Sequence, residues 1–207
     1  MLKIKPKFDY RQSALSSFLN DLGSSSVSPG GGSAAALAAA IGTALIEMVA
    51  GINEKKKQEA GGPPKRRRVF DRRQEIKKAQ RLRKELTTLI TKDTLVFKEI
   101  SKYFKEGKTS SRYQKALKIG ASVPLKICQL AGEAAKLGVL EKNRTSRWLY
   151  SDLKEALILL QAAFLSARLN VEINLKDISD KPFKAKTIRM LNRLEKVING
   201  YKKIVGA

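Results

Sequence analysis

Asp93 is a carboxylate placed where it could do chemistry. It lies three residues after Ile90 and four before Phe97, in a segment whose apolar residues recur with helical spacing. It therefore projects near the apolar face of that helix. A carboxylate in this place either pairs with one of the chain's many cations or occupies a site that raises its pKa. Spacing alone favours the ion pair.

A glycine-rich turn precedes an apolar, alanine-rich segment, and its last four residues are Gly30, Gly31, Gly32 and Ser33. Such glycines can adopt left-handed conformations and let a backbone or a ligand approach closely. Ser33 stands where an N-cap belongs, and the first helical turn after it would offer free N–H groups to an anionic or carbonyl-bearing ligand. An ordinary loop that leads into a buried helix is the alternative. The turn lacks the Lys-Ser/Thr pair of a phosphate loop, and a serine-rich loop stands where a dinucleotide-binding turn needs a strand.

Four polar residues stand out in the fifth apolar segment. Ser151 and Asp152 begin it, and either could simply be its N-cap. Asn170 and Asn174 lie one turn apart on one face near its end. Amides on an apolar helix need partners, so these two form either a structural hydrogen-bonded pair or donors to a ligand.

Composition narrows the possible chemistry. The chain has no histidine, so an enzyme built on it must move protons with Asp, Glu, Lys, Tyr or water, and triads or metal sites that need histidine are excluded. Its one cysteine, Cys128, excludes an internal disulfide and any multi-cysteine metal site. Because its neighbours Ile127 and Leu130 are apolar, we expect a buried thiol rather than a nucleophile.

The net charge of +23 points to an anionic partner: nucleic acid, a membrane surface or a polyanionic small molecule. The excess is strongest over Lys55–Lys84, where Phe70 is the only aromatic side chain that could stack on a base. This pattern favours a solvated helix face over nucleic-acid binding, which remains an alternative. No apolar run of membrane-spanning length lacks a charge, and no signal sequence is recognisable, so we expect no membrane partner and a cytoplasmic location.

The apolar periodicity predicts an all-α bundle of about six helices in a single domain, residues 1–207. Pro124 would kink the fourth helix, and Gly138–Arg147 would be a polar connection. The thin alanine face of the second helix suits close packing within one chain or between subunits, so we expect a homodimer. The expected helices cover Lys7–Leu22, Ser33–Lys57, Lys65–Tyr103, Ser110–Leu137, a segment from Ser151 to Asp177, and a last segment that opens at Pro182.

Several of these stretches together resemble one known family. They are Pro29–Ser33 with the helix through Met48-Val49, Leu86-Thr87-Thr88-Leu89 leading to Asp93 and Phe97, Ala121–Leu125, Ser151–Leu153 and Asn170–Leu175. In this order, over nearly the whole chain, the sequence is similar to the cyclodeaminase/cyclohydrolase family. That family comprises the C-terminal half of formimidoyltransferase-cyclodeaminase and the stand-alone methenyltetrahydrofolate cyclohydrolases.

The resemblance implies an all-helical homodimer that binds a tetrahydrofolate derivative as substrate and needs no metal. The implied reaction is hydrolysis of 5,10-methenyltetrahydrofolate to the 10-formyl form, and the alternative is cyclodeamination of the 5-formimino form with release of ammonia. Because no transferase domain is attached, we favour the cyclohydrolase. A non-catalytic basic dimer that binds nucleic acid is the alternative outside enzymology.

The resemblance also implies roles for particular residues. Asp93 would be the proton donor or general base, and Asp152 would position water or a pterin nitrogen. The turn from Gly30 to Ser33 would approach the substrate with its backbone N–H groups, and Asn170 and Asn174 would add polar contacts. Lys55, Lys56 and Lys57 would meet the glutamate tail of the folate.

The sequence departs from the family pattern at three places. Thr91 stands where the family often has an acidic residue, Ile52–Lys55 replaces a Thr-x-Gly-basic pattern, and Gly61–Arg68 looks like an insertion. We expect all three differences to fall near the folate pocket.

Overall fold

The predicted all-α bundle of about six helices is confirmed. The computed structural model describes residues 9–59, 66–201 and 204, and of residues 66–71 it describes the backbone only. Within these ranges there is no strand. The six helices are α1 (Leu15–Leu22), α2 (Gly31–Glu59), α3 (Arg66–Ser101), α4 (Ser111–Glu141), α5 (Tyr150–Asp177) and α6 (Lys181–Asn199), and short 3-10 turns η1 (Phe104–Glu106) and η2 (Arg147–Leu149) precede α4 and α5.

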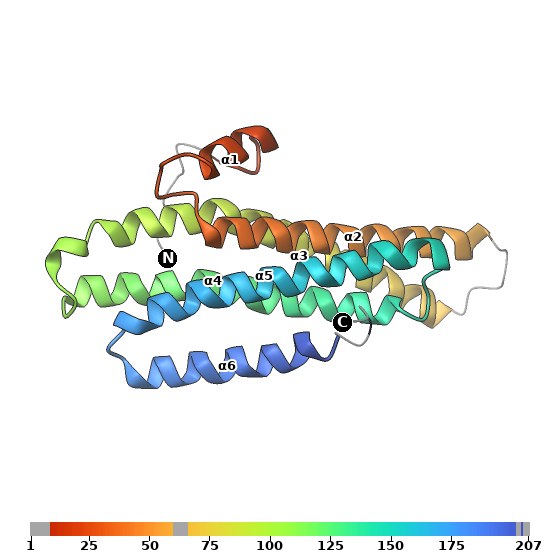
Figure 1. Ribbon diagram of the computed structural model, residues 1–207. Coiled ribbons are helices and arrows are strands. Elements are labelled where there is room, and N and C mark those ends of the chain that lie inside the picture. Colours follow the sequence, from red (N-terminus) through yellow and green to blue (C-terminus); the bar gives the residue numbers. More distant parts are fainter. Residues whose placement is uncertain (1–8, 60–65, 202–203, 205–207) are drawn as a thin grey trace.

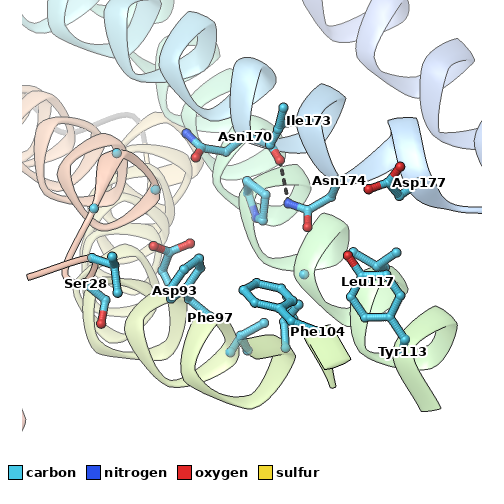
Figure 2. A pocket seen from close by; sticks show the side chains of 18 residues that line it. Ser28, Asp93, Phe97, Phe104, Tyr113, Leu117, Asn170, Ile173, Asn174 and Asp177 are labelled. Atoms are coloured by element: carbon cyan, nitrogen blue, oxygen red, sulfur yellow. Dashed lines mark hydrogen bonds between the residues drawn. The ribbon is translucent and has the colours of Figure 1, made fainter. Parts of the chain in front are cut away.

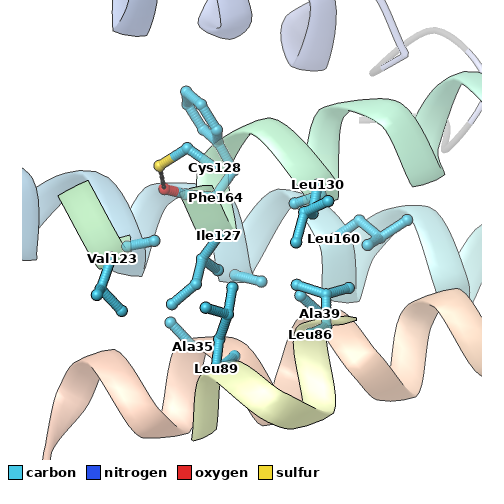
Figure 3. Packing of buried hydrophobic residues seen from close by; sticks show 14 of the residues in the cluster. Ala35, Ala39, Leu86, Leu89, Val123, Ile127, Cys128, Leu130, Leu160 and Phe164 are labelled. Atoms are coloured by element: carbon cyan, nitrogen blue, oxygen red, sulfur yellow. Dashed lines mark hydrogen bonds between the residues drawn. The ribbon is translucent and has the colours of Figure 1, made fainter. Parts of the chain in front are cut away.

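The four long helices α2 to α5 lie side by side and form the body of the bundle, while α1 and α6 lie outside it (Figure 1). α2 packs against α3, α4 and α5, and α6 rests mainly on α4. Small residues allow the helices to approach closely: a Cβ on Gly42 of α2 would come within 2.9 Å of the Ala156 carbonyl oxygen on α5. Fully buried side chains from all four helices pack in the core, including Ala39, Leu86, Ile127 and Phe164 (Figure 3).

The predicted boundaries hold for most helices and fail at the start of α1 and at the end of α4. α1 begins at Leu15, because residues 10–13 form a turn; Lys7 and Phe8 lie outside the described residues. α4 does not end before Gly138 but runs to Glu141, because Gly138 is buried against Ile46 and Leu157. α4 is also a continuous helix through Pro124.

A buried polar cluster ties the helices together at one end of the bundle. The Arg72 guanidinium lies 3.0 Å from Glu141 and 3.5 Å from Glu54, and all three side chains are less than a tenth exposed. The Asn53 amide donates to the same Glu141 carboxylate at 2.9 Å. These contacts join α2, α3 and α4 through charged groups, each of which would be costly to leave alone in the interior.

Two helical segments, Gly31–Glu59 and Arg147–Asp177, are long and apolar enough to cross a membrane when one or two charges are tolerated. Within the bundle, 50% and 39% of their most apolar stretches are buried. Core helices of soluble proteins have the same length and composition, so this is a weak sign of a membrane span. Each of these two helices also exposes large apolar side chains, for example Ile41 on α2 and Leu169 on α5.

Candidate active site

The glycine turn begins α2, although not in the way that the sequence predicts. α2 starts at Gly31, two residues before the expected cap, and the Ala34 N–H donates to the Gly30 carbonyl at 3.0 Å. Ser33 is therefore not the N-cap. Its side chain is fully buried, and its hydroxyl oxygen lies 2.9 Å from the Ile90 carbonyl oxygen of α3. Among the described residues only Gly107 has a positive φ, so this turn uses its glycines for close approach rather than for left-handed backbone.

Asp93 of α3 is the residue that makes this close approach necessary. A Cβ on Gly32 would lie 2.2 Å from Asp93 Oδ1 and 2.5 Å from its Cγ, so the carboxylate lies directly against the glycine backbone. The Ser33 hydroxyl lies 3.1 Å from Asp93 Oδ2, and the Ser33 N–H also donates to the carboxylate. No salt bridge forms to Asp93 in the part of the chain that the structure describes, so the ion pair that spacing favoured is wrong.

The surroundings of Asp93 shift the pKa of its carboxyl group upward. Burial raises the pKa of Asp93 above its ordinary value of 3.8, and the two hydrogen bonds from Ser33 only partly oppose that rise. A carboxyl group of this kind exchanges a proton more readily near neutral pH than an ordinary aspartate does. It is therefore suited to general acid–base work.

A cavity of about 370 Å³ opens in front of Asp93 between the ends of α2, α3, α4 and α5 (Figure 2). Gly30, Gly31 and Gly32 line one end of it together with Asp93. Among the residues that the structure describes, none that lines the cavity is Lys or Arg. In a chain with a net charge of +23, the described lining holds two carboxylates, of which only Asp177 is paired with a cation, Lys108 at the rim; this suits a cationic or hydrogen-bond-donating ligand.

Asn170 and Asn174 both line this cavity, but they do not form a side-chain pair. Each amide nitrogen donates to a backbone carbonyl four residues earlier, Asn170 to Ser166 at 2.9 Å and Asn174 to Asn170 at 2.7 Å. Neither carboxamide oxygen accepts a hydrogen bond within the described ranges. The two amides therefore present acceptors to a ligand, where the sequence suggested donors.

Three aromatic rings form one wall of the cavity beyond Asp93. Phe97 of α3 meets Phe104 of η1 edge to face, with ring centroids 6.4 Å apart, and Phe104 meets Tyr113 of α4 in the same way at 6.2 Å. Phe104 is 54% exposed although it is a large apolar side chain. Sequence reasoning quoted Phe97 but missed Phe104 and Tyr113, because nothing in the turn before α4 predicts that it folds back over the cavity.

The remaining predicted site residues lie outside this cavity. Lys55 and Lys56 follow Gly31 by at least 24 residues on α2, about 36 Å along a helix. Asp152 precedes Asn170 by 18 residues on α5, about 27 Å along the helix axis. Within one chain, these three side chains cannot touch a ligand that also touches Asp93.

Two of the three departures from the family pattern also lie away from the cavity, contrary to expectation. Thr91 is 6% exposed, and its hydroxyl hydrogen bonds to Asp9 at 3.2 Å and accepts from the Tyr10 N–H at 3.1 Å. Asn53 belongs to the buried polar cluster with Glu141. The third departure, Gly61–Arg68, lies outside the residues whose side chains are described.

The titratable groups beyond Asp93 give the site no further nucleophile or metal cluster. Cys128 is fully buried, as predicted, and burial raises the pKa of its thiol to about 12. Among the described residues, no three or more Cys, Asp or Glu side chains are grouped so as to hold a metal ion.

The chain is similar to one protein family in sequence and to a solved structure in fold. The family model described as Formiminotransferase-cyclodeaminase matches residues 14–193. The chain is 29% identical over 188 residues to a methenyltetrahydrofolate cyclohydrolase of Methylorubrum extorquens, a match that covers 87% of this chain and 88% of that protein. It is 32% identical over 191 residues to the formimidoyltransferase-cyclodeaminase of Gallus gallus, of which the match covers 34%. A solved structure, the formiminotetrahydrofolate cyclodeaminase of Thermotoga maritima, superposes with a TM-score of 0.83 at 27% identity, covering 95% of this chain and 97% of that one.

Proposed function

The chain belongs to the formiminotransferase-cyclodeaminase family, and from that premise we propose that it hydrolyses 5,10-methenyltetrahydrofolate to 10-formyltetrahydrofolate. The cyclohydrolase of Methylorubrum extorquens supports this reaction, because the similarity to it covers most of both chains. Cyclodeamination of 5-formiminotetrahydrofolate is the second candidate, and the fold similarity to the Thermotoga maritima enzyme favours it.

The observation that carries the proposal is the position of Asp93 against Gly32, in a cavity whose described lining contains no Lys or Arg. The methenyl carbon of the substrate lies between two nitrogens and shares a positive charge with them. Carboxylates and carboxamide oxygens stabilise such a cation, whereas a lining of lysine or arginine would repel it. The formimino substrate also carries a basic amidine, so the same lining suits the second candidate.

One carboxyl group can carry both proton transfers of the hydrolysis. Asp93 accepts a proton from water as the water oxygen bonds to the methenyl carbon, which gives a neutral tetrahedral adduct. It then returns this proton to N5 as the bond between that carbon and N5 breaks, with the electron pair going to N5. The hydroxyl proton leaves to solvent as the formyl C=O forms, so the reaction releases one proton overall. Burial raises the pKa of Asp93 above its ordinary value, which makes its carboxylate a stronger base for the proton that it takes from water.

The test is an absorbance assay that follows the loss of methenyltetrahydrofolate by the wild-type protein and by Asp93→Asn. We expect the wild type to exceed the buffer-catalysed rate and the variant to lose about 100-fold or more of kcat, the usual contribution of a general acid–base group. Ammonia release from the formimino substrate, measured in parallel, distinguishes the two candidates. Hydrolysis no faster than in buffer would refute the cyclohydrolase, and an unimpaired Asp93→Asn would refute the role of Asp93.

A homodimer is part of the proposal, and an outward apolar face supports it. α2 and α5 pack against each other, and each also presents large apolar side chains to the outside. Such a patch on two adjacent helices is typical of a subunit interface. The side chains are Ile41 and Met48 on α2 and Ile158, Leu165, Leu169 and Ile173 on α5, which are 39–67% exposed.

A charge introduced into this apolar face tests the dimer. Leu169, 67% exposed, becomes a buried side chain if a second copy covers this face, so Leu169→Lys should yield monomers in sedimentation velocity while the wild type sediments as a dimer. The matched control is Ile188→Lys on α6, where a 45% exposed side chain lies outside the α2–α5 face. A monomeric wild type, or a dimer that survives Leu169→Lys, would argue against this interface.

A further inference from the structure

We infer that the aromatic arm of the cavity binds the fused 2-amino-4-oxo ring system of the substrate, with the Asp177 carboxylate accepting the N–H groups of its 2-amino edge. The inference rests on the proposed function, because it takes a folate as the substrate. It assigns a binding role to Asp177, Phe104 and Tyr113, for which the sequence predicted none.

The shape of the cavity separates the end at Asp93, where the one-carbon bridge lies, from an aromatic end that can hold the fused ring. With the one-carbon bridge at Asp93, each ring system of the folate must extend away from that carboxylate. The arm that leaves Asp93 runs past Phe97 and Phe104 to Tyr113 (Figure 2). Its aromatic wall offers ring faces and edges against which a flat heterocycle can stack. The 54% exposure of Phe104 in the free protein fits a side chain that a ligand covers.

The opposite wall of the same arm supplies hydrogen-bond acceptors. Asp177, the last residue of α5, lines the cavity, and within the described residues its Oδ2 atom makes no hydrogen bond. The Asn174 oxygen is likewise without a donor and lies one turn away on the same helix. The 2-amino group and the adjacent ring N–H of the heterocycle are parallel donors. A carboxylate matches that pair with two oxygens, which gives strong and directional hydrogen bonds.

Lys108 provides the means of separating binding from a structural role. Its ammonium group lies 2.7 Å from Asp177 Oδ1, and its side chain is 76% exposed at the rim. A purely structural role for Asp177 would be to fasten the turn before α4 to the end of α5. Gln114 already makes that connection, because its side-chain amide donates to the Lys108 carbonyl at 2.7 Å and to the Asp177 carbonyl at 2.8 Å. The backbone of the arm thus keeps its ties when either side chain of the ion pair is changed.

The experiment compares Asp177→Asn with Lys108→Met in the full chain. Dissociation constants for 6-methyltetrahydropterin, which contains the fused ring and no benzoylglutamate, are measured by calorimetry, and kcat and KM are measured with methenyltetrahydrofolate. We expect Asp177→Asn to weaken pterin binding and raise KM on the order of 10- to 100-fold, because it removes hydrogen bonds to a charged acceptor. We expect kcat to change little and Lys108→Met to bind the pterin at least as tightly as the wild type.

Two results would overturn the inference. Equal losses in Asp177→Asn and Lys108→Met would show that the ion pair acts only on structure, and unchanged pterin binding in Asp177→Asn would show that the ring lies elsewhere. These outcomes are distinct from failure of the proposed function, which would appear as absent turnover in the wild type. Phe104→Leu is an independent test, because it should weaken pterin binding several-fold if the ring stacks on this aromatic wall.

Discussion

Replacing Gly32 by alanine adds one methyl group at the most crowded contact of the candidate site. The new Cβ would lie 2.2 Å from Asp93 Oδ1 and 2.6 Å from Oδ2. Ordinary van der Waals contact begins near 3.4 Å, so the carboxylate must move by about 1.2 Å. The open cavity beside Asp93 leaves room for this movement. We therefore expect the helix to remain folded and the carboxylate to be displaced.

Displacement of this size has a large effect on rate and a small one on stability. Misplacing a catalytic group by about 1 Å costs on the order of 100-fold in rate, because the reacting atoms no longer meet in the productive geometry. The hydrogen bond from Ser33 to Asp93 Oδ2, 3.1 Å long, would be broken by the same movement. We expect kcat/KM for methenyltetrahydrofolate to fall about 100-fold in Gly32→Ala, with a circular dichroism spectrum like that of the wild type.

Gly51→Ala is the matched control, because Gly51 lies on the same helix and a Cβ there would meet nothing within 4 Å in the chain. This variant should keep the wild-type kcat/KM and gain about 0.5–1 kcal/mol of stability, the usual advantage of alanine over glycine inside a helix. The reasoning is refuted if Gly32→Ala hydrolyses the substrate as fast as Gly51→Ala, since Asp93 would then tolerate the displacement.

Three more predictions follow from the hydrogen bonds and burial of particular side chains. Ser33→Ala removes a hydrogen bond that lowers the pKa of Asp93, so the acidic limb of the plot of log kcat/KM against pH should move to higher pH. Because the pKa of Asp93 in the folded protein lies above 3.8, its ionisation destabilises the fold as pH rises through that pKa. Thermal melts at neutral pH should therefore show Asp93→Asn to be more stable than the wild type. This difference should disappear below pH 3.8. Arg72→Met leaves the buried Glu54 carboxylate, 8% exposed, without its cation and removes one of the two cations that contact Glu141, so it should cost about 3–5 kcal/mol in urea unfolding, with kcat per folded molecule unchanged.

The helices follow from the sequence where apolar side chains repeat over several turns. In α3 and α5 the periodic leucines predict the inward face, and Leu82, Leu86 and Leu160 are indeed almost fully buried. The ends of the helices depend on contacts that no local pattern reveals. α2 extends back to Gly31 because the Ser33 hydroxyl finds a partner in α3, and α4 extends past Gly138 because that glycine fits beneath α2 and α5.

The candidate site was predictable where one residue carries the signal and unpredictable where distant segments meet. The family resemblance predicted that Asp93 and the glycine turn belong to one site, and the structure places them in contact. The ion pair expected for Asp93 was wrong because charge counts say nothing about which cations reach a cavity. Asp177 went unnoticed, since its relation to the aromatic wall arises only when α5 ends beside η1 and α4.

The contrast between a chain with a net charge of +23 and a cavity whose described lining has no Lys or Arg has a kinetic consequence. A folate carries carboxylates at one extremity, so the long-range field of the protein should accelerate its diffusional encounter and turn that extremity toward the lysine-rich surface. Dissolved electrolyte shortens the reach of this field to about 10 Å at 0.1 M ionic strength, while interactions inside the cavity are far less screened. Added sodium chloride should therefore lower the rate at which dilute substrate is captured and leave turnover at saturation nearly constant.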